Sequence, residues 1–262
     1  MDMSIAQCRR KRLELSEGSG EKENMHRKWI WLIVIIFAAA MAWVESVLVL
    51  FMRMLIEHLE LYRQGPLPAS LGLGQTEFIR EAATLVMLLA VGWLAGRSWR
   101  DRLGYSLLAF GVWDILYYLF LIPLTSWPQS PLDWDLLFLI PLPWWGPVLA
   151  PLSLSGVMIL FGASLIWSYS RINVIWPSRL IWGLHLLGIL LVLYVFMADS
   201  IHAVLQGLHA TNYRPPSQFD WRLFVLALGM IASPVIAMLR QFWPPASKHF
   251  FHHETTSSGG VS

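Results

Sequence analysis

The sequence predicts an all-α integral membrane protein, a bundle of six transmembrane helices with a short interfacial or re-entrant helix between the third and the fourth. Composition is the first reason, because 56% of the 262 residues are hydrophobic and only 14% are charged, with a mean hydropathy of +0.54. Soluble domains carry about a quarter charged residues. The second reason is a set of six apolar segments that each reach the roughly 17–25 residues needed to cross a bilayer. They lie at 29–55, 77–96, 104–124, 146–167, 179–199 and 221–240.

The two ends of the chain differ from this apolar centre. Residues 1–28 are polar and basic and are expected to form a disordered cytoplasmic tail, in which Met25 is a second candidate start of translation. Residues 29–240 form a single transmembrane domain, and residues 241–262 are a second disordered cytoplasmic tail. The only cysteine, Cys8, lies in the first tail, so the chain cannot form an internal disulfide.

The basic residues indicate the orientation. Most of the 19 lysines and arginines fall in the first tail or at the ends of segments that share its side of the membrane. Cytoplasmic flanks of membrane helices are enriched in these residues. We therefore expect both termini to be cytoplasmic, in a membrane of the bacterial inner (cytoplasmic) type.

Acidic residues inside the first two segments are the first candidates for a site. Glu45 lies in the first segment, and Glu81 lies in the second with Thr84 three residues later on the same helical face. A charged side chain at the centre of a membrane helix costs about 2.5–3.5 kcal/mol on insertion scales. These carboxyl groups are therefore expected to face a polar interior of the bundle and not lipid.

The third segment carries Asp114 together with Gly111, Tyr117 and Tyr118 at helical spacing. Gly111 permits close approach of a neighbouring helix, and the tyrosine hydroxyls are candidate hydrogen-bond partners of the carboxyl group. Two interpretations remain open for Asp114: a neutral structural acid, or a group that binds a ligand or transfers a proton.

Residues 125–147 predict the short interfacial helix. Ser130, Pro131 and Asp133 together are typical of a helix start, and Pro141 with Pro143 would end it after about ten residues, too few to span. Its tryptophans suit the headgroup region. Such a helix would hold Asp135 over the outer mouth of the bundle, or would serve only as an anchor between two spans.

The last two segments contain further polar positions. His185, Gly188, Phe196 and Asp199 fall on one face of the fifth segment, and His202 follows three residues later. His185 is expected either to bind a ligand or to bond a neighbouring helix. Ser233 and Pro234 predict a kink in the sixth segment.

The candidate chemistry is that of carboxylates, with or without imidazoles. Glu45, Glu81, Asp114 and Asp135 are the candidate catalytic groups, and His58 and His202 are candidate ligands of a non-haem divalent metal. No Glu-x-x-His or His-x-x-x-His spacing within residues 29–240 supports the metal, and no phosphate loop, dinucleotide fingerprint or nucleophile motif is present. Nucleic-acid binding has no support beyond the basic tail.

Three functions fit this sequence. The first is a membrane-embedded enzyme that acts on a lipid, isoprenoid or quinone-like amphiphile through the carboxylate and histidine site in the outer half of the membrane. The second is a small proton-coupled permease, although the sequence lacks the internal repeats of many transporters. The third is a non-catalytic accessory subunit whose buried acids pair with a membrane protein partner.

Overall fold

The computed structural model describes residues 25–54, 73–139, 141–169, 176–206 and 218–241. Within these residues the chain forms six long apolar helices: Met25–Met54, α2 (Leu73–Ala95), α3 (Trp99–Thr125), α4 (Leu149–Tyr169), α5 (Arg179–Leu205) and α6 (Trp221–Leu239). Each contains a stretch long and apolar enough to cross a membrane. The predicted six-helix membrane protein is therefore confirmed. Residues 1–24 and 242–262 of the two predicted tails lie outside the described residues, as does His58, whereas residues 25–28 belong to the Met25–Met54 helix.

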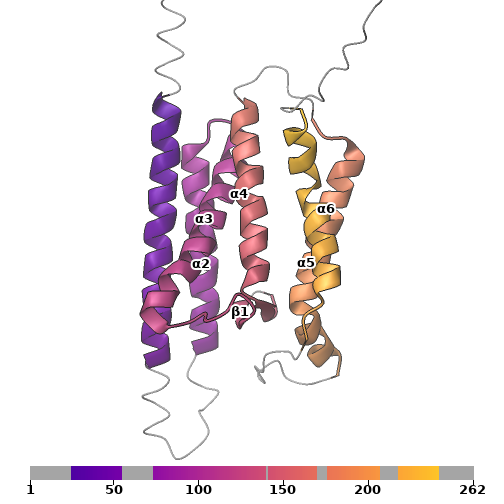
Figure 1. Cartoon of the computed structure of the whole chain (residues 1–262). Coiled ribbons are helices and arrows are strands. Elements are labelled where there is room, and N and C mark those ends of the chain that lie inside the picture. The colour runs from indigo at the N-terminus through magenta and orange to yellow at the C-terminus, as the bar shows by residue number, and fades with distance from the viewer. Residues whose placement is uncertain (1–24, 55–72, 140, 170–175, 207–217, 242–262) are drawn as a thin grey trace, which may run out of the picture.

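The helices run side by side as one bundle (Figure 1). α3 is central, because it packs against both α2 and α4, while α5 and α6 form a pair that contacts α4 through α6. Val34 and Ala42 of the Met25–Met54 helix are buried in one core with Leu88 of α2 and Leu108 of α3. A separate core joins α5 and α6.

Glycines let α3 and α4 approach until their backbones touch. A Cβ atom placed on Gly162 would lie 2.5 Å from the carbonyl oxygen of Gly104, and one on Gly111 would lie 2.7 Å from the carbonyl oxygen of Ser155. No side chain fits at such distances. Small residues serve this purpose at the interfaces of membrane helices, where backbone proximity increases van der Waals contact.

A β-hairpin joins α3 to α4 at one end of the bundle, which we call the hairpin end. Strand β1 (Trp134–Phe138) pairs antiparallel with β2 (Trp144–Pro147), and Asp135 lies opposite Gly146. β2 also contacts α5 and α4. The hairpin thus lies at the end of α4, next to α5 (Figure 1).

The short helix predicted for this segment is therefore wrong. The Asp133 carboxylate does accept two backbone N–H groups, at 2.7 Å from Gln129 and 3.1 Å from Ser130, but both donors precede it in the chain. The residues that resemble a helix start close a turn instead. The chain then continues extended, in keeping with the preference of aromatic residues for strands.

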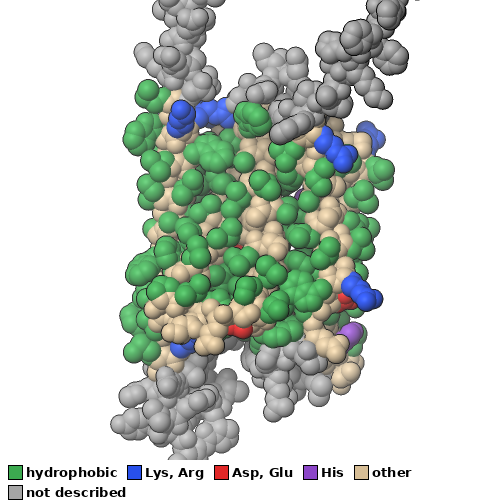
Figure 2. Space-filling model, in the orientation of Figure 1, with side chains coloured by type: hydrophobic (Ala, Val, Ile, Leu, Met, Phe, Trp, Pro, Cys, Tyr) green, Lys and Arg blue, Asp and Glu red, His purple; other side chains and the backbone are tan. Residues whose placement is uncertain are grey.

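The outside of the bundle is suited to lipid. Large apolar side chains are exposed on every one of the six helices, including Leu94, Leu180 and Val225. Figure 2 shows hydrophobic side chains over the middle of the visible face, with lysines and arginines towards its two ends. A continuous apolar band between charged ends is the pattern expected of a bilayer-spanning protein.

Candidate carboxylate cavity

The four candidate catalytic acids lie around one cavity at the hairpin end. Glu45 comes from the Met25–Met54 helix, Glu81 from α2, Asp114 from α3 and Asp135 from β1, and all four line a space of about 320 Å³. Four segments far apart in the sequence thus bring carboxyl groups together, which is the convergence that would distinguish a site from isolated buried acids. Their catalytic roles stay a prediction.

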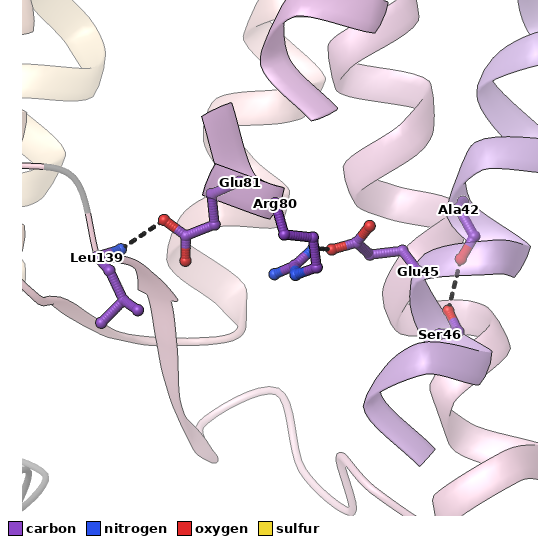
Figure 3. A network of polar contacts seen from close by, with 6 residues as sticks. All are labelled: Ala42, Glu45, Ser46, Arg80, Glu81 and Leu139. Atoms are coloured by element: carbon purple, nitrogen blue, oxygen red, sulfur yellow. Dashed lines mark hydrogen bonds and ion pairs between the residues drawn. The ribbon is translucent and has the colours of Figure 1, made fainter. Parts of the chain in front are cut away.

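Glu45 is held by an ion pair. Its Oε1 atom meets a guanidinium nitrogen of Arg80, which extends from α2 towards the Met25–Met54 helix (Figure 3). One turn of α2 therefore supplies both the cation for Glu45 and the neighbouring acid Glu81. Close to this pair, the Ser46 hydroxyl donates to the carbonyl oxygens of Ala42 at 2.7 Å and of Tyr117 at 3.1 Å, which fixes the Met25–Met54 helix against α3.

Glu81 ties α2 to the hairpin. Its Oε2 atom accepts the backbone N–H of Leu139 at 2.8 Å, immediately after β1 ends (Figure 3). The acid is buried, with 7% of its surface exposed. Because Leu139 follows the last residue of β1, this bond satisfies a backbone donor that has no place in the two-stranded ladder.

Asp114 is bonded across the close contact of α3 with α4. The Ser155 hydroxyl of α4 donates to Asp114 Oδ2 at 2.8 Å, and Gly111 lies one turn before the acid, against the Ser155 backbone. The expected bond from Tyr118 to this acid is wrong, since the Tyr118 hydroxyl donates to Asp135. Asp114 and Asp135 line the same cavity.

Asp135 accepts two hydrogen bonds, from the Tyr118 hydroxyl at 2.8 Å and from the N–H of Leu136 at 2.9 Å. Burial nevertheless raises the pKa of this carboxyl from 3.8 to about 6, because loss of hydration disfavours the charged form more than these bonds and the Arg53 charge favour it. A carboxyl group with a pKa near neutral can both accept and release a proton under ordinary conditions.

Aromatic side chains form much of the remaining surface of the cavity. A continuous series of rings, each with its centroid 5.1–6.3 Å from the next, runs from α3 through the hairpin to α5, and we call it the aromatic wall. It consists of Tyr118, Tyr117, Trp113, Phe110, Phe138, Trp144 and Phe196. Charged groups and flat apolar surfaces thus face the same space, as in sites that bind amphiphilic small molecules.

The histidines that the structure describes do not line this cavity. His202 is exposed near the end of α5, and His58 lies outside the described residues. His185 is buried, and its Nδ1 atom lies 2.8 Å from the carbonyl oxygen of Ile231, so it bonds the neighbouring helix α6. In the described part of the chain, no three His, Cys, Asp or Glu side chains gather closely enough to hold a metal ion.

Arg80, Trp113 and Trp144 are cavity residues that the sequence did not single out. A basic residue next to Glu81 inside an apolar segment was the available signal for Arg80, because an intramembrane charge requires a partner. For the two tryptophans no signal was available, since indole rings are common near membrane interfaces.

Comparison with known proteins does not assign this arrangement. No protein family, no curated protein and no solved structure matches the chain. What the fold establishes is a multi-pass membrane protein with a carboxylate-lined cavity.

Proposed function

We propose that the protein is a membrane-embedded enzyme that acts on a lipid, isoprenoid or quinone-like substrate by general acid–base chemistry in this cavity. The convergence of Glu45, Glu81, Asp114 and Asp135 on one partly aromatic cavity carries the proposal. Burying four carboxyl groups at the end of a membrane bundle costs free energy that a purely structural role would not require.

Asp135 is the proposed proton-transferring group. With a pKa of about 6 it is mostly ionised at pH 7, while about a tenth of the molecules keep it protonated, so both forms are accessible near neutral pH. The Tyr118 hydroxyl holds Oδ2 of Asp135 in position at 2.8 Å. Asp114 is the proposed second acid, while the ion pair of Glu45 with Arg80 and the bond of Glu81 to Leu139 fix the shape of the cavity.

The charge distribution supports an outward-facing site. Arg27, Lys28 and Arg179 begin helices at the end opposite the hairpin, and Arg240 follows the last turn of α6 at that same end. The positive-inside rule favours a cytoplasmic location for that end, which supports a cavity in the outer half of a membrane of the bacterial inner type. Substrate would then enter from the outer leaflet or along the hairpin.

Conversion of membrane lipids by the purified protein tests the proposal. The protein in nanodiscs is incubated with a bacterial lipid extract, and new or depleted species are measured by mass spectrometry. We expect conversion by the wild type, and a loss of about 100-fold or more in rate for Asp135→Asn, since general acid–base groups contribute about 10²–10⁴-fold.

Asp199→Asn is the matched control, because Asp199 is an exposed carboxylate on α5 that does not line the cavity. It should convert lipids at the wild-type rate. Full activity of a folded Asp135→Asn variant, or no conversion of any species by the wild type, would contradict the proposal. Solute uptake driven by a pH gradient in proteoliposomes would indicate a carrier instead.

A further inference from the structure

Two hydrogen-bond donors in the aromatic wall have no acceptor among the residues that the structure describes. The indole nitrogens Nε1 of Trp113 and Trp144 are buried, and within the described residues neither has a hydrogen-bond partner. Trp113 itself is only 6% exposed. A buried donor without an acceptor costs about 1–3 kcal/mol, so native proteins rarely keep two of them in one place. Both residues line the carboxylate cavity, where a ligand could supply the missing acceptors.

The acids of the cavity do not fill this need. Glu45 is paired with Arg80, Glu81 accepts the N–H of Leu139, Asp114 accepts the hydroxyl of Ser155, and Asp135 accepts from Tyr118 and Leu136. Each of these acids thus has its own partner within the described residues, and neither indole N–H group is among those partners. A ligand that suits the cavity therefore brings acceptor atoms.

The charge of the lining limits which acceptors fit. Four carboxyl groups and the two guanidinium groups of Arg53 and Arg80 face the cavity, and the guanidinium of Arg53 lies 4.8 Å above the Trp127 ring. Carboxyl groups outnumber guanidinium groups four to two, so an anionic phosphate or carboxylate head group would find no excess of positive charge in the cavity. A neutral carbonyl oxygen accepts an indole N–H without requiring such an excess.

The rings of the aromatic wall also restrict the shape of the ligand. The aromatic wall presents faces and edges of seven rings in series, among them the stacked pair Trp144 and Phe196 at 6.1 Å. Flat conjugated rings gain offset-stacked and edge-to-face contacts against such a surface. The cavity of about 320 Å³ is near the lower limit of small-molecule sites, so it accommodates a ring system and not a long chain as well.

We propose that the cavity binds the neutral ring of a quinone, with its carbonyl oxygens accepting the indole N–H groups of Trp113 and Trp144 and any polyprenyl tail extending outside the cavity. The inference rests on the proposed function and narrows its substrate class. A quinone joins the two required properties in one molecule, because its carbonyl acceptors lie in the plane of a flat ring.

Equilibrium dialysis of nanodisc-reconstituted, full-length protein against menadione tests the proposal, with empty nanodiscs to subtract partitioning. Menadione is a methylated naphthoquinone, and methylnaphthalene is the same ring system without the two carbonyl oxygens. We expect saturable binding of menadione, at least about tenfold tighter than that of methylnaphthalene, because a neutral hydrogen bond contributes about 0.5–1.5 kcal/mol and two are lost.

Trp113→Phe and Trp144→Phe keep an aromatic ring and remove the N–H group. Each should weaken menadione binding about three- to tenfold and leave methylnaphthalene binding unchanged. Trp43→Phe is the control, since Trp43 is 48% exposed and does not line the cavity. Equal binding of the two ring systems, or undiminished menadione binding by both folded variants, would overturn the proposal.

The experiments distinguish failure of the enzyme proposal from failure of the quinone-binding proposal. Asp135→Asn should still bind menadione while losing lipid conversion, because Asp135 is not one of the two donors. Lipid conversion that depends on Asp135 together with no saturable menadione binding would retain the enzyme and exclude the quinone ring.

Discussion

At the scale of residues, the molecule shows how buried acids are kept in a membrane bundle. Each of the four acids has its own partner: a guanidinium for Glu45, a backbone N–H for Glu81, a serine hydroxyl for Asp114 and a tyrosine hydroxyl for Asp135. Such local bonds compensate the loss of hydration that burial imposes. The acids therefore remain individually satisfied while facing a shared space.

The carboxyl group of Asp135 makes stability depend on pH. Its pKa is raised from 3.8 to about 6 by burial, so between these two values the folded protein binds a proton that the unfolded chain has released. The free energy of unfolding should fall by roughly 3 kcal/mol at most as pH rises through this window, and should then level off. Thermal melting in detergent from about pH 4 to about pH 7 measures the effect.

Asp135→Asn isolates that contribution from other titrating groups. The wild type should lose stability relative to this variant as pH rises from about 4 to about 6. If the melting temperatures of the two proteins change with pH in the same way across this range, the raised pKa of Asp135 is refuted.

Removing one partner of the ion pair between Glu45 and Arg80 should lower the stability of the protein more than removing both partners. Arg80→Met leaves the buried Glu45 carboxylate without its cation, which should destabilise the protein by about 3–5 kcal/mol. The double variant Glu45→Gln, Arg80→Met removes both charges and should recover part of this loss. Melting temperatures in detergent measure the coupling, and additive effects of the two substitutions would contradict it.

At the scale of elements, the packing of α3 on α4 depends on particular glycines. Ala at position 162 would bring its Cβ to 2.5 Å from the Gly104 carbonyl oxygen, so Gly162→Ala should force the helices apart and cost about 1–3 kcal/mol. Gly156 lies on the same helix, and a methyl group added there would meet no described atom within 4 Å, so Gly156→Ala should be tolerated. Equal melting temperatures for the two variants would show that backbone contact is unimportant here.

The hairpin is the element that sequence patterns described least well. Ser130, Pro131 and Asp133 match a helix start, yet the Asp133 carboxylate closes a turn because the donors it bonds lie before it. The outcome depends on Trp144–Pro147 being available as a pairing strand, which is a contact outside the local segment. The six spans were predictable because membrane helices depend on local length and hydropathy alone.

At the scale of the whole molecule, the sequence predicted which acids are buried but not that they meet. Their positions in the chain place Glu45, Glu81 and Asp114 inside spans, while their convergence depends on how the helices are ordered around α3. Arg80 illustrates the limit, because its partner lies on another helix, far away in the chain. Pairings of this kind are set by tertiary packing.

The orientation of the bundle can be tested directly. In a Cys8→Ser background, a cysteine at the exposed Gln129 of the hairpin end should react with a membrane-impermeant maleimide in intact spheroplasts. A cysteine at the exposed Ser178, before α5 at the opposite end, should react only after lysis if that end is cytoplasmic, as the proposed orientation requires. The reverse labelling pattern would place the cavity on the cytoplasmic side.

The close contact of α3 with α4 has a consequence for the timing of ligand exchange. The backbones of α3 and α4 touch at Gly104 and Gly162, so these helices are not expected to separate and admit a ring. A ligand should therefore enter and leave beside the hairpin, which is held by the bonds of Glu81 to Leu139 and of Ser200 to Pro143. Those bonds then act as a kinetic barrier. Occupants of the cavity would leave slowly even when their affinity is modest, and Glu81→Ala should shorten their residence time more than it weakens equilibrium binding.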